Sequence, residues 1–147
     1  FDEGFNLVKK VLDLRSEKPI DLLFETLVVL LESLGITTSV IRSSEIRYSG
    51  TKDDLVLNIC EQMNAGVYVA GMGGLNYMED MTKFTKKGIE VKYYQFNGFE
   101  YPQDKKFPFL MGLSTLDMIM FNGIEKSKEL FWENFPKNKT QESSGGY

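Results

Sequence analysis

The chain has 147 residues, a length that suits one domain built around one hydrophobic core. Apolar residues make up 42% and charged residues 26%, a composition typical of a globular protein rather than a disordered one. The net charge is -4 and no basic stripe is present, so we expect no nucleic-acid partner.

The absence of histidine and the single cysteine exclude several kinds of chemistry. Ser-His-Asp and Cys-His catalysis by this chain alone, a zinc site of the usual Cys/His type and an internal disulfide all require residues that it lacks. Cys60 lies in an apolar helical pattern, where we expect a buried small hydrophobe. A lone cysteine fits a reducing compartment, so we expect a cytoplasmic protein. The longest apolar run, Leu27 to Leu31, is too short to span a membrane.

The first half of the chain predicts two helices, a strand and a third helix. Apolar residues at helical spacing begin at Phe5, and a stronger helix covers Asp21 to Leu34, with Pro19 suited to its start and Gly35 to its end. Ile36 to Ile41 is rich in β-branched residues and predicts a strand. Thr51 is typical of an N-cap, and the helix after it should run to about Met63.

The second half of the chain predicts two further strands that alternate with helices. Val67 to Ala70 is a continuous apolar run and predicts a strand buried on both faces. A helix from about Tyr77 to Lys87 should end at Gly88, and the alternation in Ile89 to Gln95 predicts another strand. An irregular arm rich in aromatic residues covers 97–112. Ser114 then begins a helix to about Asn122, and a final helix should reach Phe135.

This order predicts an α/β fold. We expect three layers, with a short parallel sheet, flanking helices and a C-terminal helical segment. The predicted organisation is a single α/β domain over residues 1–135, the C-terminal part of a longer protein, followed by a flexible polar tail over residues 136–147.

The clearest candidate site is a turn with three glycines, Gly71, Gly73 and Gly74, between a predicted strand and a predicted helix. Bare backbone and a helix N-terminus suit an anionic group, although the spacing is neither a dinucleotide fingerprint nor a P-loop. The alternative is a tight turn that needs glycine. Ser43 and Ser44 follow another predicted strand, and they are either ligand contacts at the same sheet edge or a plain turn.

The aromatic arm supplies a second set of candidates. Tyr101 and Gln103 could hydrogen-bond a sugar or a base, or could only anchor the arm to the core. Asp117 is an acid/base candidate, and its alternative role is the acidic half of a capping box with Ser114.

These segments together resemble the WbqC-like family of bacterial proteins. The resemblance covers about residues 1–131 and rests on Ser43-Ser44, Gly71-Met72-Gly73-Gly74-x-x-Tyr77, Gly88-Ile89-Glu90-Val91, Tyr101-Pro102-Gln103, and Leu113-Ser114-x-x-Asp117 with Phe121-Asn122-Gly123. It implies a place in the biosynthesis of O-antigen, capsule and related glycans. The family's amino-terminal section, with its histidine- and proline-bearing opening motif, has no counterpart here.

Two interpretations follow from the residues and the resemblance. In the first, the chain is a transferase that acts on a nucleotide-linked sugar or an activated acyl donor. Gly71, Gly73 and Gly74 would hold the anionic group, and Asp117 would be the acid or base. The acceptor would be oriented by hydroxyl and amide side chains: Ser43, Ser44, Tyr77, Tyr101 and Gln103. In the second, the chain is a non-catalytic binding or scaffold module of a glycan-assembly complex. The sequence predicts no metal site and identifies no cofactor. A homo-oligomer or a glycan-pathway protein is the expected macromolecular partner.

Overall fold

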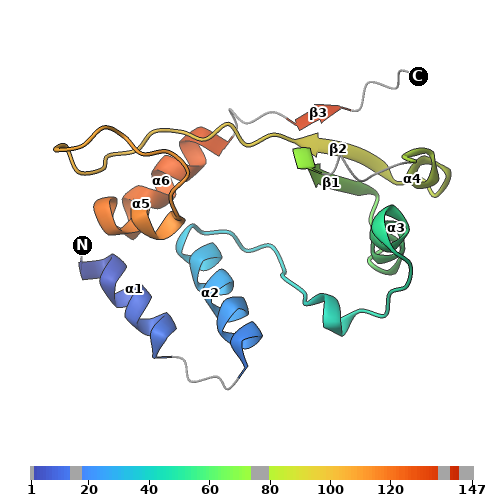
Figure 1. Cartoon of the computed structure of the whole chain (residues 1–147), viewed down its shortest axis with the longest axis horizontal. Coiled ribbons are helices and arrows are strands. Elements are labelled where there is room, and N and C mark those ends of the chain that lie inside the picture. The colour runs from blue at the N-terminus through green and yellow to red at the C-terminus, as the bar shows by residue number, and fades with distance from the viewer. Residues whose placement is uncertain (1, 14–17, 74–79, 136–139, 143–147) are drawn as a thin grey trace. The chain divides into compact units, whose positions relative to one another are not determined.

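The computed structural model describes residues 2–13, 18–73, 80–135 and 140–142 (Figure 1). These residues form an α/β fold with six α-helices and a short sheet. They belong to two compact units: Phe1–Val40 with Gly98–Lys137, and Ile41–Asn97 with Asn138–Tyr147. The expectation of a single domain over residues 1–135 stays a prediction.

The first unit is helical. It contains α1 (Asp2–Leu12), α2 (Pro19–Ser33), α5 (Thr115–Asn122) and α6 (Ile124–Asn134), and the aromatic arm precedes α5. Helix α1 packs against α2 and α5, and α6 packs against the same two helices. Gly4 lets α1 approach α5 closely, because a β-carbon at this position would lie 2.9 Å from the Cα of Met120. The indole Nε1 of Trp132 donates a hydrogen bond of 2.8 Å to the carbonyl of Leu34, which joins α6 to the end of α2.

The predicted helix over residues 21–34 is confirmed as α2, which begins at Pro19 and ends at Ser33. Pro19 occupies the first turn of α2, where its missing N–H leaves no hydrogen bond unmade. Gly35 follows the helix with a φ of +71°, a left-handed conformation that favours glycine. The N–H of Ile36 then bonds back to the carbonyl of Leu31 at 2.9 Å, and this closes the end of the helix.

The second unit contains the sheet. Its elements are the 3₁₀ turn η1 (Ser43–Glu45), α3 (Lys52–Gln62), β1 (Val67–Gly71), α4 (Thr82–Lys86), β2 (Glu90–Tyr94) and β3 (Thr140–Glu142). Strands β1 and β2 pair in parallel, from Val67 opposite Glu90 to Gly71 opposite Tyr94, which confirms the predicted parallel pair. Strand β3 comes from the predicted polar tail and pairs antiparallel with β2.

One face of this sheet carries the core of the second unit. The cluster combines buried residues of α3, α4 and the two parallel strands with Ile89, which precedes β2: Cys60, Ala70, Phe84, Ile89, Val91 and Tyr93. Cys60 is buried, as its position in an apolar pattern predicts. Val69 is 55% exposed because it points to the opposite face of β1. The prediction that this strand is buried on both faces is therefore wrong.

Two further predictions for this part of the chain are corrected. Ile36 to Ile41 does not form a strand, because the segment makes no ladder hydrogen bonds with any described strand. Helix α4 begins at Thr82 rather than near Tyr77, and residues 74–79 lie outside the described residues. The carboxylate of Asp80 accepts hydrogen bonds from the backbone N–H and the hydroxyl of Thr82, the first residue of α4, at 2.9 Å and 2.6 Å.

A partly buried ion pair joins α3 to α4. The Nζ of Lys83 lies 2.8 Å from a carboxylate oxygen of Asp53, whose side chain is buried, and it also pairs with the exposed Asp54. The hydrogen bond from Lys83 lowers the pKa of Asp53 below its ordinary value of 3.8, and the bond from the backbone N–H of Asp80 acts in the same direction.

Acid should therefore destabilise the second unit through Asp53. Because the folded-state pKa is depressed, the stabilisation is complete above the unfolded-state value of 3.8 and is lost as the pH falls through the lower folded value. Urea denaturation followed between about pH 2 and pH 6 should show a steeper acid loss for the natural chain than for Asp53→Asn. Equal slopes for the two proteins would contradict this origin of acid sensitivity.

Candidate functional site

The structure brings together three residues singled out in the sequence, Tyr101, Gln103 and Asp117. Asp117 lies in the first turn of α5, whose N-cap is Ser114 as predicted. The hydroxyl of Tyr101 donates to Oδ2 of Asp117 at 2.8 Å, and Nε2 of Gln103 donates to the same oxygen at 3.0 Å. Two donors from the aromatic arm thus hold one carboxylate oxygen of the helix.

The two oxygens of Asp117 differ in their surroundings. Oδ2 receives both hydrogen bonds, whereas Oδ1 receives none from residues 2–13, 18–73 or 80–135. The carboxylate is half-buried, so its second oxygen remains within reach of a ligand. The arrangement fixes the direction of the carboxylate and leaves one oxygen free to accept a hydrogen bond or a proton from another molecule.

Ser114 caps α5 in a different way from the capping box that the spacing predicts. Its hydroxyl oxygen accepts a hydrogen bond from the N–H of Leu116 at 3.2 Å, and the N–H of Asp117 bonds instead to the backbone carbonyl of Ser114 at 2.9 Å. The Asp117 side chain instead accepts hydrogen bonds from Tyr101 and Gln103 of the arm.

Further hydrogen bonds hold the arm in place. Gln103 bonds the backbone of Leu110 in both directions: its Nε2 donates to the carbonyl at 3.0 Å, and its Oε1 accepts from the N–H at 2.9 Å. Nδ2 of Asn122, at the end of α5, donates to the carbonyl of Pro102 at 3.1 Å. Gln103 uses both amide hydrogens within the protein, so it positions the arm and Asp117.

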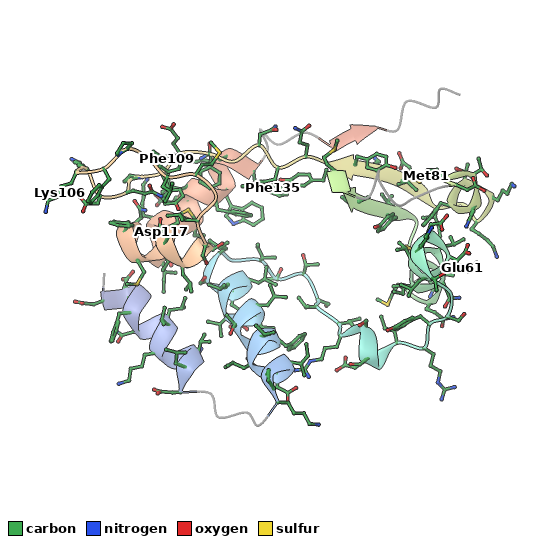
Figure 2. The ribbon with its side chains drawn as sticks, viewed as in Figure 1. Glu61, Met81, Lys106, Phe109, Asp117 and Phe135 are labelled. Atoms are coloured by element: carbon green, nitrogen blue, oxygen red, sulfur yellow. The ribbon has the colours of Figure 1, made fainter. Side chains whose placement is uncertain are left out.

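The arm forms an open cavity of about 190 Å³ at its surface. Its lining combines aromatic rings, carboxylates, an amide and one ammonium group: Glu100, Tyr101, Pro102, Gln103, Asp104, Lys105, Phe107 and Phe109. The rings of Tyr101 and Phe109 meet edge to face, with centroids 5.4 Å apart. Figure 2 shows Phe109 and Asp117 in the same part of the first unit.

Burial raises the pKa of the Tyr101 phenol, and the hydrogen bond to the Asp117 carboxylate raises it further. The phenol therefore keeps its proton at neutral pH and remains a hydrogen-bond donor to Asp117.

Sequence reasoning missed Phe107 and Asp104 as lining residues, although the density of aromatic residues in the arm was a usable signal for the first.

The other predicted site residues belong to the second unit. Ser43 and Ser44 are exposed in η1, and Gly71 ends β1 with Gly73 two residues later. Gly74 and Tyr77 lie outside the described residues. That all of these residues share a site with Tyr101, Gln103 and Asp117 stays a prediction.

The backbone conformation does not require glycine at the two described positions of this turn, Gly71 and Gly73. Neither Gly71 nor Gly73 has a left-handed φ, and a β-carbon added to either would meet no described atom within 4 Å. With respect to the described residues, the space beside both glycines is therefore open. A molecule that approaches the backbone closely would use this space.

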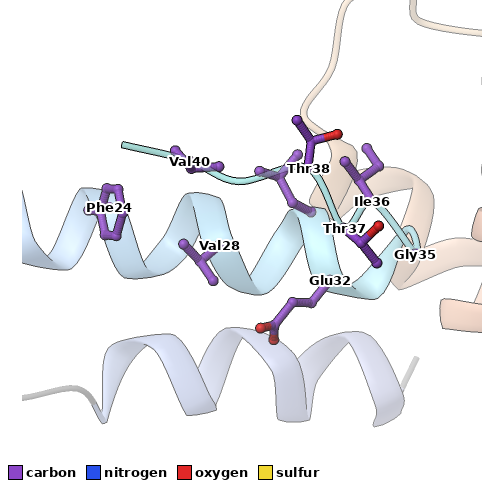
Figure 3. Close-up of a pocket in the computed structure, with 9 residues that line it drawn as sticks. Phe24, Val28, Glu32, Gly35, Ile36, Thr37, Thr38 and Val40 are labelled. Atoms are coloured by element: carbon purple, nitrogen blue, oxygen red, sulfur yellow. The ribbon is translucent and has the colours of Figure 1, made fainter. Parts of the chain in front are cut away.

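A larger groove of about 530 Å³ lies between α2 and the segment that follows Gly35. Figure 3 shows this segment turning back along α2, toward Val28 and Phe24. The lining is mostly apolar: Phe24, Val28, Leu31, Glu32, Gly35, Ile36, Thr37, Thr38 and Val40. Its volume falls in the range of small-molecule sites. Among the described residues, the lining contains one carboxylate and no lysine or arginine, so it suits a hydrocarbon group better than a phosphate.

Two kinds of feature do not occur among the described residues. No group of three or more His, Cys, Asp or Glu side chains there could hold a metal ion. No helix in the described part of the chain is long and apolar enough to cross a membrane.

The model of the WbqC-like protein family matches residues 1–129 of the chain. Neither a comparison with curated proteins nor one with solved structures found a match.

Proposed function

Because the chain belongs to the WbqC-like protein family, we propose that it is a transferase of bacterial surface-polysaccharide biosynthesis. It moves a sugar or an acyl group from an activated donor to a sugar hydroxyl in the cytoplasm. The observation that carries this proposal is the Asp117 carboxylate, which has one oxygen fixed by Tyr101 and Gln103 and the other open.

Asp117 acts in this proposal as the general base. Its open oxygen, Oδ1, accepts the proton of the acceptor hydroxyl while that hydroxyl oxygen bonds to the transferred carbon, and the donor's leaving group departs with the electron pair. Tyr101 and Gln103 hold the carboxylate in a single orientation, which limits the loss of rotational freedom when the acceptor binds. Because the chain contains no histidine, the general base in this proposal is a carboxylate.

The donor is held by the glycine turn. Gly71 and Gly73 have open space beside their backbone, which suits an anionic group, and Gly74, Tyr77, Ser43 and Ser44 complete this part of the proposal. The groove along α2 belongs to the first unit, and its described lining is mostly apolar and contains no lysine or arginine. By itself, this groove suits an acyl group better than a nucleotide.

A thermal-shift panel tests the donor site. A donor present at about 100 times its dissociation constant should stabilise the chain by about 2.7 kcal/mol, which corresponds to a rise in Tm of about 5–11 °C. The panel contains nucleotide-linked sugars and acyl thioesters, each with the corresponding free nucleotide or thiol. A side chain at Gly73 should block the donor, so Gly73→Val should lose the shift.

Gly66→Val is the matched control for this experiment. Gly66 precedes β1, also has open space beside it and also lacks a left-handed φ, so valine is sterically tolerated at both positions. The control should keep the donor-induced shift. A folded Gly73→Val protein that binds the donor as tightly as the natural chain would remove this turn from the site.

A non-catalytic binding or scaffold module is the second candidate function. Large apolar side chains are exposed in and after the arm of the first unit, among them Leu110, Met111, Leu113 and Phe121. Surfaces of this kind serve protein interfaces. The absence of donor binding and of turnover, together with self-association or capture of a glycan-pathway protein, would favour this function over the transferase.

A further inference from the structure

The arm contains a loop whose ends are joined by hydrogen bonds. The two hydrogen bonds between Gln103 and the backbone of Leu110 join the ends of residues 103–110. Inside the loop, a carboxylate oxygen of Asp104 accepts from the N–H of Lys106 at 3.0 Å, and the Asp104 carbonyl accepts from the N–H of Phe107 at 3.1 Å. Compact loops with joined ends commonly serve binding.

An exposed aromatic side chain lies on this loop. Phe107 is 71% exposed and lines the cavity of the arm together with Phe109 and Tyr101. An aromatic face is electron-rich, so it attracts C–H groups that carry a slight positive charge. The ring hydrogens on one face of a sugar have this character, and the exposed phenyl ring of Phe107 therefore suits stacking against a pyranose.

The remaining lining matches the hydroxyls of a sugar. The carboxylates of Glu100 and Asp104 are hydrogen-bond acceptors, and Lys105 is a donor. Two negative charges and one positive charge disfavour a sugar acid or a sugar phosphate. The volume of about 190 Å³ lies below the range of sites for drug-sized ligands, so it suits one sugar ring rather than a nucleotide.

We infer that the cavity of residues 100–109 is the subsite for one neutral or amino-sugar residue of the acceptor, which stacks on Phe107. This inference rests on the proposed function, and it names the substrate class that the transferase accepts. The hydrogen bonds of Gln103 and Tyr101 to Asp117 then link the subsite to the catalytic carboxylate.

Titration of the full chain with simple glycosides tests the subsite without any donor. Methyl glucoside, methyl glucosaminide and methyl glucuronide are added while protein NMR shifts are followed. The first two should bind, and the glucuronide should bind at least threefold more weakly. Phe107→Ala should weaken binding of the neutral glycoside at least tenfold, and Phe107→Tyr should retain it.

Met111→Ala is the matched control, because Met111 is 64% exposed in the same arm and does not line the cavity. This variant should bind the glycosides like the natural chain. Equal binding by the natural chain and Phe107→Ala would overturn the subsite, as would the absence of saturable binding. Tighter binding of the glucuronide would overturn the predicted substrate class.

The titration separates this inference from the proposed function, because it requires neither donor nor turnover. Glycoside binding that depends on Phe107 supports the subsite even if no donor binds, and the chain is then a sugar-binding module rather than a transferase. Donor-dependent turnover that is unaffected by Phe107→Ala supports the transferase and overturns the subsite.

Discussion

Replacing Phe84 with alanine should lower the free energy of unfolding of the second unit by about 3–5 kcal/mol. Phe84 is fully buried between the helices and the sheet, and its ring stacks on that of Tyr68 with centroids 5.7 Å apart. Truncation removes buried apolar area and leaves a cavity that the fixed strands cannot fill. Because small domains are stable by about 5–15 kcal/mol, this loss is a large part of the total.

Urea denaturation followed by far-UV circular dichroism measures this change. Phe96→Ala is the control in the same unit, because its side chain is 62% exposed and its truncation should cost less than about 1 kcal/mol. Similar losses for Phe84→Ala and Phe96→Ala would contradict the assignment of Phe84 to the core.

The ends of helices could be predicted from sequence because local stereochemistry determines them. Gly35, Gly88 and Gly123 all have left-handed φ values of +71° to +78°, and each lies where a helix or a helical turn was expected to end. These conformations depend on a few neighbouring residues. They can therefore be predicted from the sequence alone.

The strands were harder to predict because a strand is defined by its partner. Ile36 to Ile41 has strand-forming residues, yet it makes no ladder hydrogen bonds with the described strands. Val67 to Ala70 does pair, but the apolar character of Val67 and Val69 did not show that one face of the strand is exposed. Pairing and burial depend on residues distant in sequence.

The candidate site, too, could be predicted only in part from the sequence. Tyr101, Gln103 and Asp117 could be selected as chemically suitable, and the spacing of Ser114 and Asp117 correctly predicted a helix start. The spacing did not predict that Asp117 bonds to residues 14 and 16 positions earlier. Nor could sequence show that both bonds reach one oxygen, because that depends on how the arm returns to α5.

Asparagine at position 117 should abolish most of the activity while preserving the structure around it. Both donors meet Oδ2, so the asparagine carbonyl oxygen can take this place and keep the hydrogen bonds from Tyr101 and Gln103. The amide nitrogen then occupies the place of Oδ1, where it cannot accept a proton. Loss of the general base should lower kcat by about 10²–10⁴.

Turnover of the donor that the thermal-shift panel identifies, with a methyl glycoside as acceptor, measures this effect. Glu125→Gln is the matched control, because it removes a carboxylate from the first turn of α6 just as Asp117→Asn removes one from the first turn of α5. The control should keep its kcat, and both variants should unfold near the urea midpoint of the natural chain. Tyr101→Phe removes one of the two bonds that orient the carboxylate but leaves the base, so its loss of kcat should be smaller. An Asp117→Asn protein that retains its turnover would show that this carboxylate only anchors the arm.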